Sequence, residues 1–293
     1  MEPLEHQVRT PDERTLQVQE AGDPDGVPVL FHHGTPMSRL IYRGWDETAR
    51  AQHVRFLAYD RPGYGRSNRL PGRDIAACAE DVRAIAAALD INALGVIGLS
   101  GGGPHAIACA ALLEDLVPRV VSLAAVAPFD APGLDWFADT GASNVEETEL
   151  FLSDRAAARV AFEADMAALM TMTPEESRLR YASIYSELDL RCMEGDFGTF
   201  LDASTKLGLA EQIEGPWDDE YAFVAVPWGF DLGAIRTPLR LRQGRQDLMV
   251  PYGHGAWLAA HIPSAEPLLS EAESHLSLLD HLAEDLAWLT AGW

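Results

Sequence analysis

Ser100 stands in a stretch whose residue types suit nucleophilic chemistry. The letters GLSGG at 98–102 fit the pattern G-x-S-x-G, which lifts a serine hydroxyl above a sheet when it forms a strand-to-helix turn. Residues 93–99 are apolar, as a buried strand would be, and the alanine-rich run 104–113 has the composition of a helix. We therefore predict that Ser100 lies at the apex of a sharp turn, in a strained backbone conformation.

The glycines around the serine have a packing explanation and two competing interpretations. A side chain at Gly98 or Gly102 would collide with the neighbouring strand or helix of such a turn. Residues 101–106 also satisfy G-x-G-x-x-A, a dinucleotide-binding fingerprint, but this run lies in the middle of the predicted sheet, and Asp130 is the one acidic residue near the expected position. A purely structural glycine-rich turn is the second alternative.

A serine hydroxyl becomes a nucleophile when a histidine accepts its proton and an acid orients that histidine. In this type of fold the acid and then the histidine follow the serine along the chain. Asp247 follows a strand-like run at 238–243, and His275 precedes the last predicted helix. A purely structural role for Asp247, capping the helix that begins near Pro251, stays open, and Asp130 is the alternative acid.

Acyl transfer also requires hydrogen-bond donors for the developing oxyanion. We expect them to be the backbone N–H groups of Gly101 and Thr35, with Gly34 allowing close approach. His33 and its neighbour His32 precede the serine and are interpreted as loop-bracing residues. The other histidines near the site in sequence, His254 and His281, lie inside predicted helices and are assigned to packing or to the surface.

Strands and helices must alternate to position these residues. Strand-like runs occupy 15–22, 28–33, 54–60, 93–99, 119–128 and 238–243, and helix-like runs occupy 39–52, 74–89 and 104–113, with Asp74 placed to cap the second helix. Runs such as VVSLAAVA are apolar on both faces, which is typical of strands covered by helices on both sides. The sequence predicts an α/β fold with a doubly wound, mostly parallel sheet.

The alternation stops at about residue 131 and resumes near 217. Helix-like segments at 146–152, 155–171 and 174–187 fill the interval, and a terminal helix is expected at 276–289. We predict a core formed by residues 1–131 and 217–293, with a helical cap inserted at 132–216. Apolar side chains of this insertion either pack the cap or line a pocket: Phe151, Phe162, Met166, Met170, Met172, Phe197 and Phe200.

The composition of the chain disfavours some classes of binding partner. The 293 residues carry 45 acidic and 22 basic side chains, a formal net charge of −23, which repels nucleic acid and anionic membranes. Three cysteines, Cys78, Cys109 and Cys192, are widely spaced, which favours buried thiols over a metal site or a disulfide. No signal peptide or membrane span is recognisable, so we expect a cytoplasmic protein that binds neither nucleic acid nor membrane.

Together the motifs resemble the α/β-hydrolase fold family, and within it the capped, serine-dependent hydrolases and esterases. The resemblance rests on five stretches in family order: HGTP at 33–36, DRPGYGRS at 60–67, GLSGG at 98–102, GRQDLMVP at 244–251 and HLS at 275–277. The serine at the turn separates the chain from dehalogenases and epoxide hydrolases, which carry aspartate there. Gly101 separates it from proline iminopeptidases, and the long insertion disfavours haloperoxidase-like members.

The resemblance implies a serine hydrolase that cleaves a small to medium ester with an apolar part, without metal or organic cofactor. Hydrolysis of a C–C bond or a lactone by the same residues is an alternative. A hydrolase-like ligand receptor and, more distantly, a nicotinamide-dependent oxidoreductase are alternatives from other classes. The sequence leaves the natural substrate, the acyl chain length and the oligomeric state undetermined.

Overall fold

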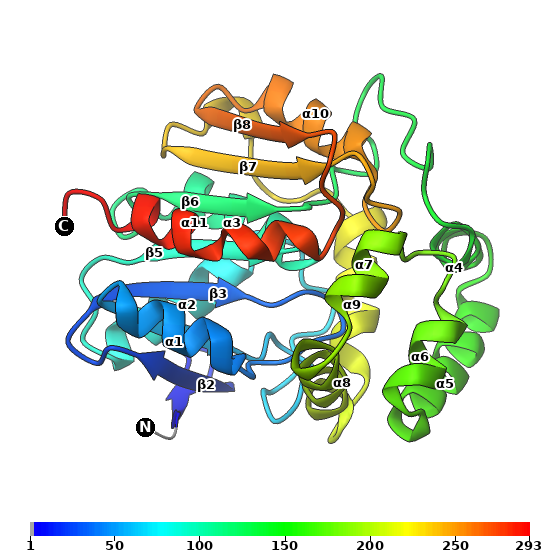
Figure 1. Cartoon of the computed structure of the whole chain (residues 1–293), viewed down its shortest axis with the longest axis horizontal. Coiled ribbons are helices and arrows are strands. Elements are labelled where there is room, and N and C mark those ends of the chain that lie inside the picture. Colours follow the sequence, from blue (N-terminus) through cyan, green and yellow to red (C-terminus); the bar gives the residue numbers. More distant parts are fainter. Residues whose placement is uncertain (1–2) are drawn as a thin grey trace.

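A computed structural model describes residues 3–293, so residues 1 and 2 of the predicted core lie outside the described residues (Figure 1). Its centre is an eight-stranded sheet in the order β1-β2-β4-β3-β5-β6-β7-β8. β2 pairs antiparallel with both β1 and β4, and every other pair is parallel. The predicted α/β class and mostly parallel sheet are confirmed.

In the core, most strands and helices begin and end within a few residues of the ranges predicted from the sequence. The strands are β1 Leu4–Arg9, β2 Thr15–Gly22, β3 Val27–His32, β4 Val54–Tyr59, β5 Gly95–Leu99, β6 Val120–Leu123, β7 Leu239–Gly244 and β8 Ala265–Ser270. The core helices are α1 Arg43–Ala51, α2 Cys78–Ala88, α3 Gly102–Leu112, α10 Tyr252–His261 and α11 Leu282–Leu289, with short 3₁₀ turns at Leu232–Ala234 and Ser277–His281.

Helices cover both faces of the sheet, as the doubly apolar strands predict. One apolar cluster packs α2, α3 and α10 against the sheet, through residues such as Ile85, Ile107 and Leu258. The other packs α1 and α11 against the opposite face, through residues such as Trp45 and Leu286. Cys78 and Cys109 are buried thiols. The parallel strands are thereby fixed from both sides, and their carboxyl ends form one edge.

Six helices lie between β6 and β7: α4 Ala142–Ser153, α5 Arg155–Thr171, α6 Pro174–Arg180, α7 Glu187–Cys192, α8 Asp196–Leu209 and α9 Glu214–Val224. They form a layer beside the carboxyl ends of the parallel strands (Figure 1). The division at 132–216 stays a prediction; its upper bound falls in the first turn of α9. In the described part of the chain, no helix is long and apolar enough to cross a bilayer.

Four local expectations need correction. The strand predicted at 119–128 ends at Leu123, and of the helix predicted at 174–187 only Pro174–Arg180 is helical before α7 begins at Glu187. The terminal helix predicted at 276–289 is a 3₁₀ turn followed by α11, so His281 precedes the α-helix instead of lying inside it. Asp74 does not cap α2, which begins at Cys78; its carboxylate accepts from Ala77 N–H at 2.9 Å in the preceding turn.

Candidate active site

Ser100 occupies a turn held by its backbone. β5 lies between β3 and β6, and Ser100 N–H donates to the Leu123 carbonyl of β6 at 2.8 Å. Gly103 N–H donates back to the Ser100 carbonyl at 2.8 Å, which starts α3. These bonds hold Ser100 at a φ of 54°, in the left-handed region that costs a non-glycine residue roughly 1–2 kcal/mol. The strained turn that the sequence predicts is present.

The glycines of the motif allow chain segments to touch. A Cβ on Gly98 would lie 2.2 Å from the Gly102 carbonyl oxygen and 2.9 Å from Ala106 Cβ of α3. A Cβ on Gly102 would lie 2.1 Å from the His32 carbonyl oxygen of β3. Neither contact leaves room for a side chain, so these glycines are required by packing.

His275 and Asp247 are brought together from loops 28 residues apart in sequence. His275 Nδ1 lies 2.8 Å from Asp247 Oδ2, and both side chains are buried. The other carboxylate oxygen accepts from Met249 and Val250 N–H at 2.9 and 2.8 Å. Asp247 therefore orders the loop before α10 and also orients a histidine, whereas the alternative acid, Asp130, is exposed.

The hydrogen bond to Asp247 leaves His275 Nε2 as the free ring nitrogen. Burial opposes the charged form of the ring, but the nearby Asp247 carboxylate outweighs burial and raises the pKa of His275 above its ordinary value. Asp189, on cap helix α7, accepts from the Leu276 N–H at 2.8 Å and so holds the loop beside this histidine. The pair is suited to accept a proton from a neighbouring hydroxyl.

Thr35 and Gly101 lie against each other and close to the serine. A Cβ on Gly34 would be 3.4 Å from Ser100 Cβ, and one on Gly101 would be 2.3 Å from Thr35 Oγ1. Among the described residues, neither the Thr35 nor the Gly101 N–H donates to a backbone carbonyl. Both N–H groups are thus available to an external acceptor.

A buried ion cluster lies beneath these two residues. Asp219 of α9 accepts from the Thr35 hydroxyl at 2.5 Å, from the Tyr64 hydroxyl at 2.5 Å and from Arg61 at 2.6 Å, and its second oxygen accepts from Arg73. Burial alone would raise the pKa of Asp219, but Arg61 and Arg73 outweigh it and hold this pKa well below its ordinary value. The cluster fixes the Thr35 side chain through an ionised carboxylate.

The same cluster reaches Gly101 through His105. The ring lies between Arg73, 3.3 Å from Nε2, and the Gly101 carbonyl oxygen, 2.8 Å from Nδ1. Burial lowers the pKa of His105 well below its ordinary value, so the ring is neutral and donates from Nδ1. The Thr35 side chain and the Gly101 carbonyl are therefore both tied to one ionic group.

Two further histidines near the site, His33 and His254, have structural partners. His33 is buried and its Nδ1 donates to the Gly34 carbonyl at 2.9 Å, while burial holds its pKa well below the ordinary value. His254 Nδ1 accepts from Ala127 N–H and its Nε2 donates to the Trp136 carbonyl, each at 2.9 Å. Both ring nitrogens of His33 and of His254 therefore have partners in the protein. These contacts agree with the predicted structural roles, bracing a loop for His33 and packing for His254.

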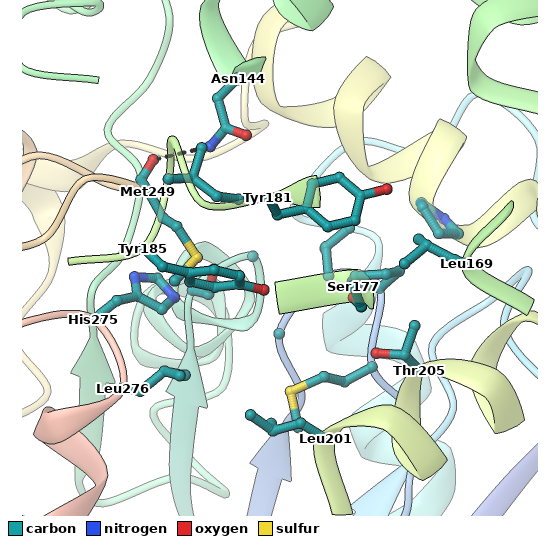
Figure 2. Close-up of a pocket in the computed structure, with 18 of the residues that line it drawn as sticks. Asn144, Leu169, Ser177, Tyr181, Tyr185, Leu201, Thr205, Met249, His275 and Leu276 are labelled. Carbon is teal, nitrogen blue, oxygen red and sulfur yellow. Dashed lines mark hydrogen bonds between the residues drawn. The ribbon is translucent and has the colours of Figure 1, made fainter. Parts of the chain in front are cut away.

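Ser100 and His275 open into a cavity of about 690 Å³ between the sheet edge and the cap. Figure 2 shows His275 and the cap tyrosines Tyr181 and Tyr185 projecting into it, with Asn144 donating to the Met249 carbonyl at 3.3 Å. Of the seven apolar cap residues that were predicted either to pack the cap or to line a pocket, Phe162 and Met166 line the cavity. Phe151 packs on Trp217, and Phe197 packs on Tyr42, so the predicted apolar set divides between lining and packing.

The described residues contain no group of three or more His, Cys, Asp or Glu side chains that could hold a metal ion. Sequence reasoning missed Asp219, Arg61, Arg73 and Asp189 because each acts through a partner far away in the chain. The stretch DRPGYGRS contains Arg61, but nothing in its pattern names a carboxylate 158 residues later as its partner.

Known proteins resemble this chain over all or part of its length. A family model described as alpha/beta hydrolase fold matches residues 27–282. A non-heme chloroperoxidase from Streptomyces lividans is 36% identical over 126 residues, which are 41% of this chain and 45% of that protein. A bifunctional esterase/perhydrolase from Acinetobacter calcoaceticus is 32% identical over 126 residues, again 41% of this chain and 45% of that protein.

Among solved structures, an enol-lactonase from Burkholderia xenovorans superposes with a TM-score of 0.70 over 97% of this chain and 99% of its own, at 19% identity. That likeness shows the fold. The chain matches less than half the length of the two curated relatives. A chloroperoxidase is among these relatives, and the distinction from haloperoxidases that the long insertion implies stays a prediction.

Proposed function

Because this chain belongs to the α/β-hydrolase fold family, a hydrolase family with an esterase among the relatives, we propose that it is a serine hydrolase. Its substrate is a small to medium carboxylic ester or a related acyl compound. The observation that carries the proposal is the buried His275–Asp247 pair, which borders the same cavity as a serine held at positive φ.

In the proposed reaction, Ser100 Oγ attacks the substrate carbonyl carbon while His275 Nε2 accepts the hydroxyl proton. Asp247 keeps the ring in the tautomer with Nδ1 protonated and stabilises the imidazolium that forms. The Thr35 and Gly101 N–H groups donate to the oxyanion. His275 then returns the proton to the departing alcohol, and water hydrolyses the acyl-enzyme by the same steps in reverse.

The test is labelling with a fluorophosphonate, which reacts with activated serines, followed by peptide mass spectrometry. We expect the adduct on Ser100 in the wild type and its loss in His275→Ala. Ser177→Ala, which removes another cavity-lining serine, is the matched control and keeps the label. A folded wild type without adduct would contradict the proposal.

Turnover separates a hydrolase from a ligand receptor with the same residues. On p-nitrophenyl acetate we expect many turnovers per protein molecule without a stall. Release of a single equivalent of p-nitrophenol followed by arrest would favour the receptor. A panel of lactones run in parallel establishes whether ring opening competes with ester cleavage.

A further inference from the structure

The cavity that adjoins Ser100 is acidic at its cap end. Among the described residues that line it, six are acidic and one is an arginine, Arg178. The acidic residues are Glu147, Asp165, Glu175, Glu194, Asp202 and Glu220. A hydrolase with a purely apolar substrate has no use for this excess of carboxylates.

Three of these carboxylates already have cationic partners. Asp165 binds Arg180 at 2.7 Å, and Glu175 binds Arg178 at 2.7 Å. Asp202 binds Lys206, the single lysine of the chain, at 2.9 Å. Their charge is balanced within the protein, so they do not demand a ligand.

The other three, Glu147, Glu194 and Glu220, pair with no basic side chain of the described residues, and the charge of Glu220 acts on Glu147. Glu220, on α9, accepts from the Thr148 hydroxyl of α4 at 2.8 Å, and burial raises its pKa to about 6. Glu147, one residue before Thr148 on α4, is exposed by its accessible surface and lines the cavity wall. Desolvation by the surrounding protein, together with the charges of Glu220 and Asp165, raises the pKa of Glu147 to about 7.

No basic side chain of the described residues pairs with Glu147 or Glu220. Glu147 also lacks a hydrogen-bond donor, although its side chain borders the cavity. Two neighbouring carboxyls without a counter-charge repel each other when both are ionised, and a cation bound beside them would relieve that repulsion. Along α4, Asn144, Glu147 and Thr148 all line the cavity, because positions three and four apart share one helix face.

From this arrangement we propose that the cap end of the cavity binds a cationic amine, so that the substrates are acyl compounds that carry an ammonium group away from the scissile bond. The inference rests on the proposed hydrolase function for its scissile bond. Glu147 and Glu220 supply the counter-charge, and the rings of Trp136, Phe162 and Tyr181, which also line the cavity, offer faces that attract cations.

Binding tests the proposal without turnover. In Ser100→Ala protein, isothermal titration calorimetry compares n-hexylammonium with 1-hexanol, which differ mainly in charge. We expect the ammonium to bind about tenfold more tightly or better, as charge-assisted hydrogen bonds allow. Equal affinities would overturn the proposal, because protonated carboxyls that merely accept a neutral hydroxyl would not distinguish the two probes.

Variants locate the site. Glu147→Gln and Glu220→Gln each reduce the preference for the ammonium, and the double variant abolishes it. The matched control is Glu146→Gln, which removes the same charge from the residue beside Glu147 that does not line the cavity, and it keeps the preference. If the double variant binds the ammonium as tightly as Ser100→Ala alone, the proposal is wrong.

Kinetics extend the test to catalysis. The esters p-nitrophenyl 6-aminohexanoate and p-nitrophenyl heptanoate have equal chain lengths and differ by an ammonium in place of a methyl group. We expect kcat/KM to favour the amino ester about tenfold and this ratio to collapse in the double variant. Equal cleavage of both esters would refute the amine site and leave the hydrolase proposal intact; failure of Ser100 to react with a fluorophosphonate would refute the hydrolase proposal itself.

Discussion

The two ends of the cavity handle polar groups in opposite ways. At the sheet end, Asp247 and Asp219 each accept from several donors, and the rings of His105 and His254 engage both nitrogens. At the cap end, Glu147 and Glu220 lack a cationic partner. Polar groups that have all their hydrogen-bond partners are held in one geometry, and a catalytic reaction requires such fixed geometry. Carboxylates without a cationic partner can instead pair with a cationic ligand. In the function proposed here, the sheet end carries out the reaction and the cap end recognises the substrate.

The largest effect should follow a change at the sheet end. We expect Ser100→Ala to lower kcat on p-nitrophenyl esters by at least about a thousandfold, because no other group is placed to attack. Circular dichroism and thermal unfolding check that the fold is kept. The control Ser177→Ala should retain activity within a few-fold. Substantial hydrolysis by a folded Ser100→Ala protein would contradict the mechanism.

Asp247→Asn should come next. An asparagine can donate to Nδ1 and favour the wrong tautomer of His275, so kcat/KM should fall by about 10³–10⁴. In the wild type, kcat/KM should rise with pH through the His275 pKa, which lies above its ordinary value, as the ring loses its proton and becomes a base. Without the carboxylate, burial dominates and this inflection moves to lower pH. An unmoved inflection would contradict the assigned pair.

The Asp219 cluster should affect stability as well as rate. Asp219→Asn leaves Arg61 and Arg73 buried without their counter-charge, which should cost about 3–5 kcal/mol in urea unfolding. Its neighbour provides the comparison: Asp218 is also buried, but it pairs with Arg69, whose side chain is 34% exposed. Asp218→Asn leaves that cation in contact with water and should therefore cost less than Asp219→Asn. Equal losses would show that the buried cluster has no special role.

This difference should depend on pH in a defined direction. The pKa of Asp219 is held well below its ordinary value in the folded protein, so its contribution is present above the unfolded pKa of about 4. As the pH falls toward the folded pKa, that contribution is lost. Urea unfolding at several pH values should therefore show wild type and Asp219→Asn converging in acid, and a gap that widens in acid would be the contrary result.

The smallest effect belongs to the cap. Phe162 lines the cavity and packs against Trp217, so Phe162→Ala should lower kcat/KM for p-nitrophenyl hexanoate relative to the acetate by about tenfold. Phe197 packs against Tyr42 and Trp45 outside the lining. Phe197→Ala should lower the midpoint of thermal unfolding and leave the ratio of the two esters unchanged. A changed ratio in Phe197→Ala would break this distinction.

The core could be predicted from sequence because its signals are local. Apolar runs located β2 to β5 and β7 within two residues, and α5 lies at the predicted 155–171, whereas the run at 119–128 is longer than β6, which ends at Leu123. β1 was missed because its side chains are mostly exposed, with Val8 the one buried residue, so its pattern lacks a buried face. Most of the cap could only be assigned as helical, since α6 and α7 are short and the packing of the cap helices depends on distant partners.

The candidate site divides in the same way. The elbow around Ser100 and the loops of Asp247 and His275 have local patterns that indicate their place. Asp219 and Glu147 have none: each is an acidic residue on a helix, and its environment depends on chain segments brought together by folding. Their desolvation, which separates them from surface acids, exists only in three dimensions.

β1 also bears on how separate molecules of this protein meet. Seven of the eight residues of β2 are buried, and without β1 its backbone N–H and C=O groups would form an open sheet edge, a template for pairing with another chain. β1 covers that edge through a register from Leu4 opposite Glu20 to Arg9 opposite Thr15. It presents Glu5 and Arg9 at the new boundary, where charge discourages a further strand from adding. The strand with the weakest sequence signal thus protects this edge of the sheet against aggregation.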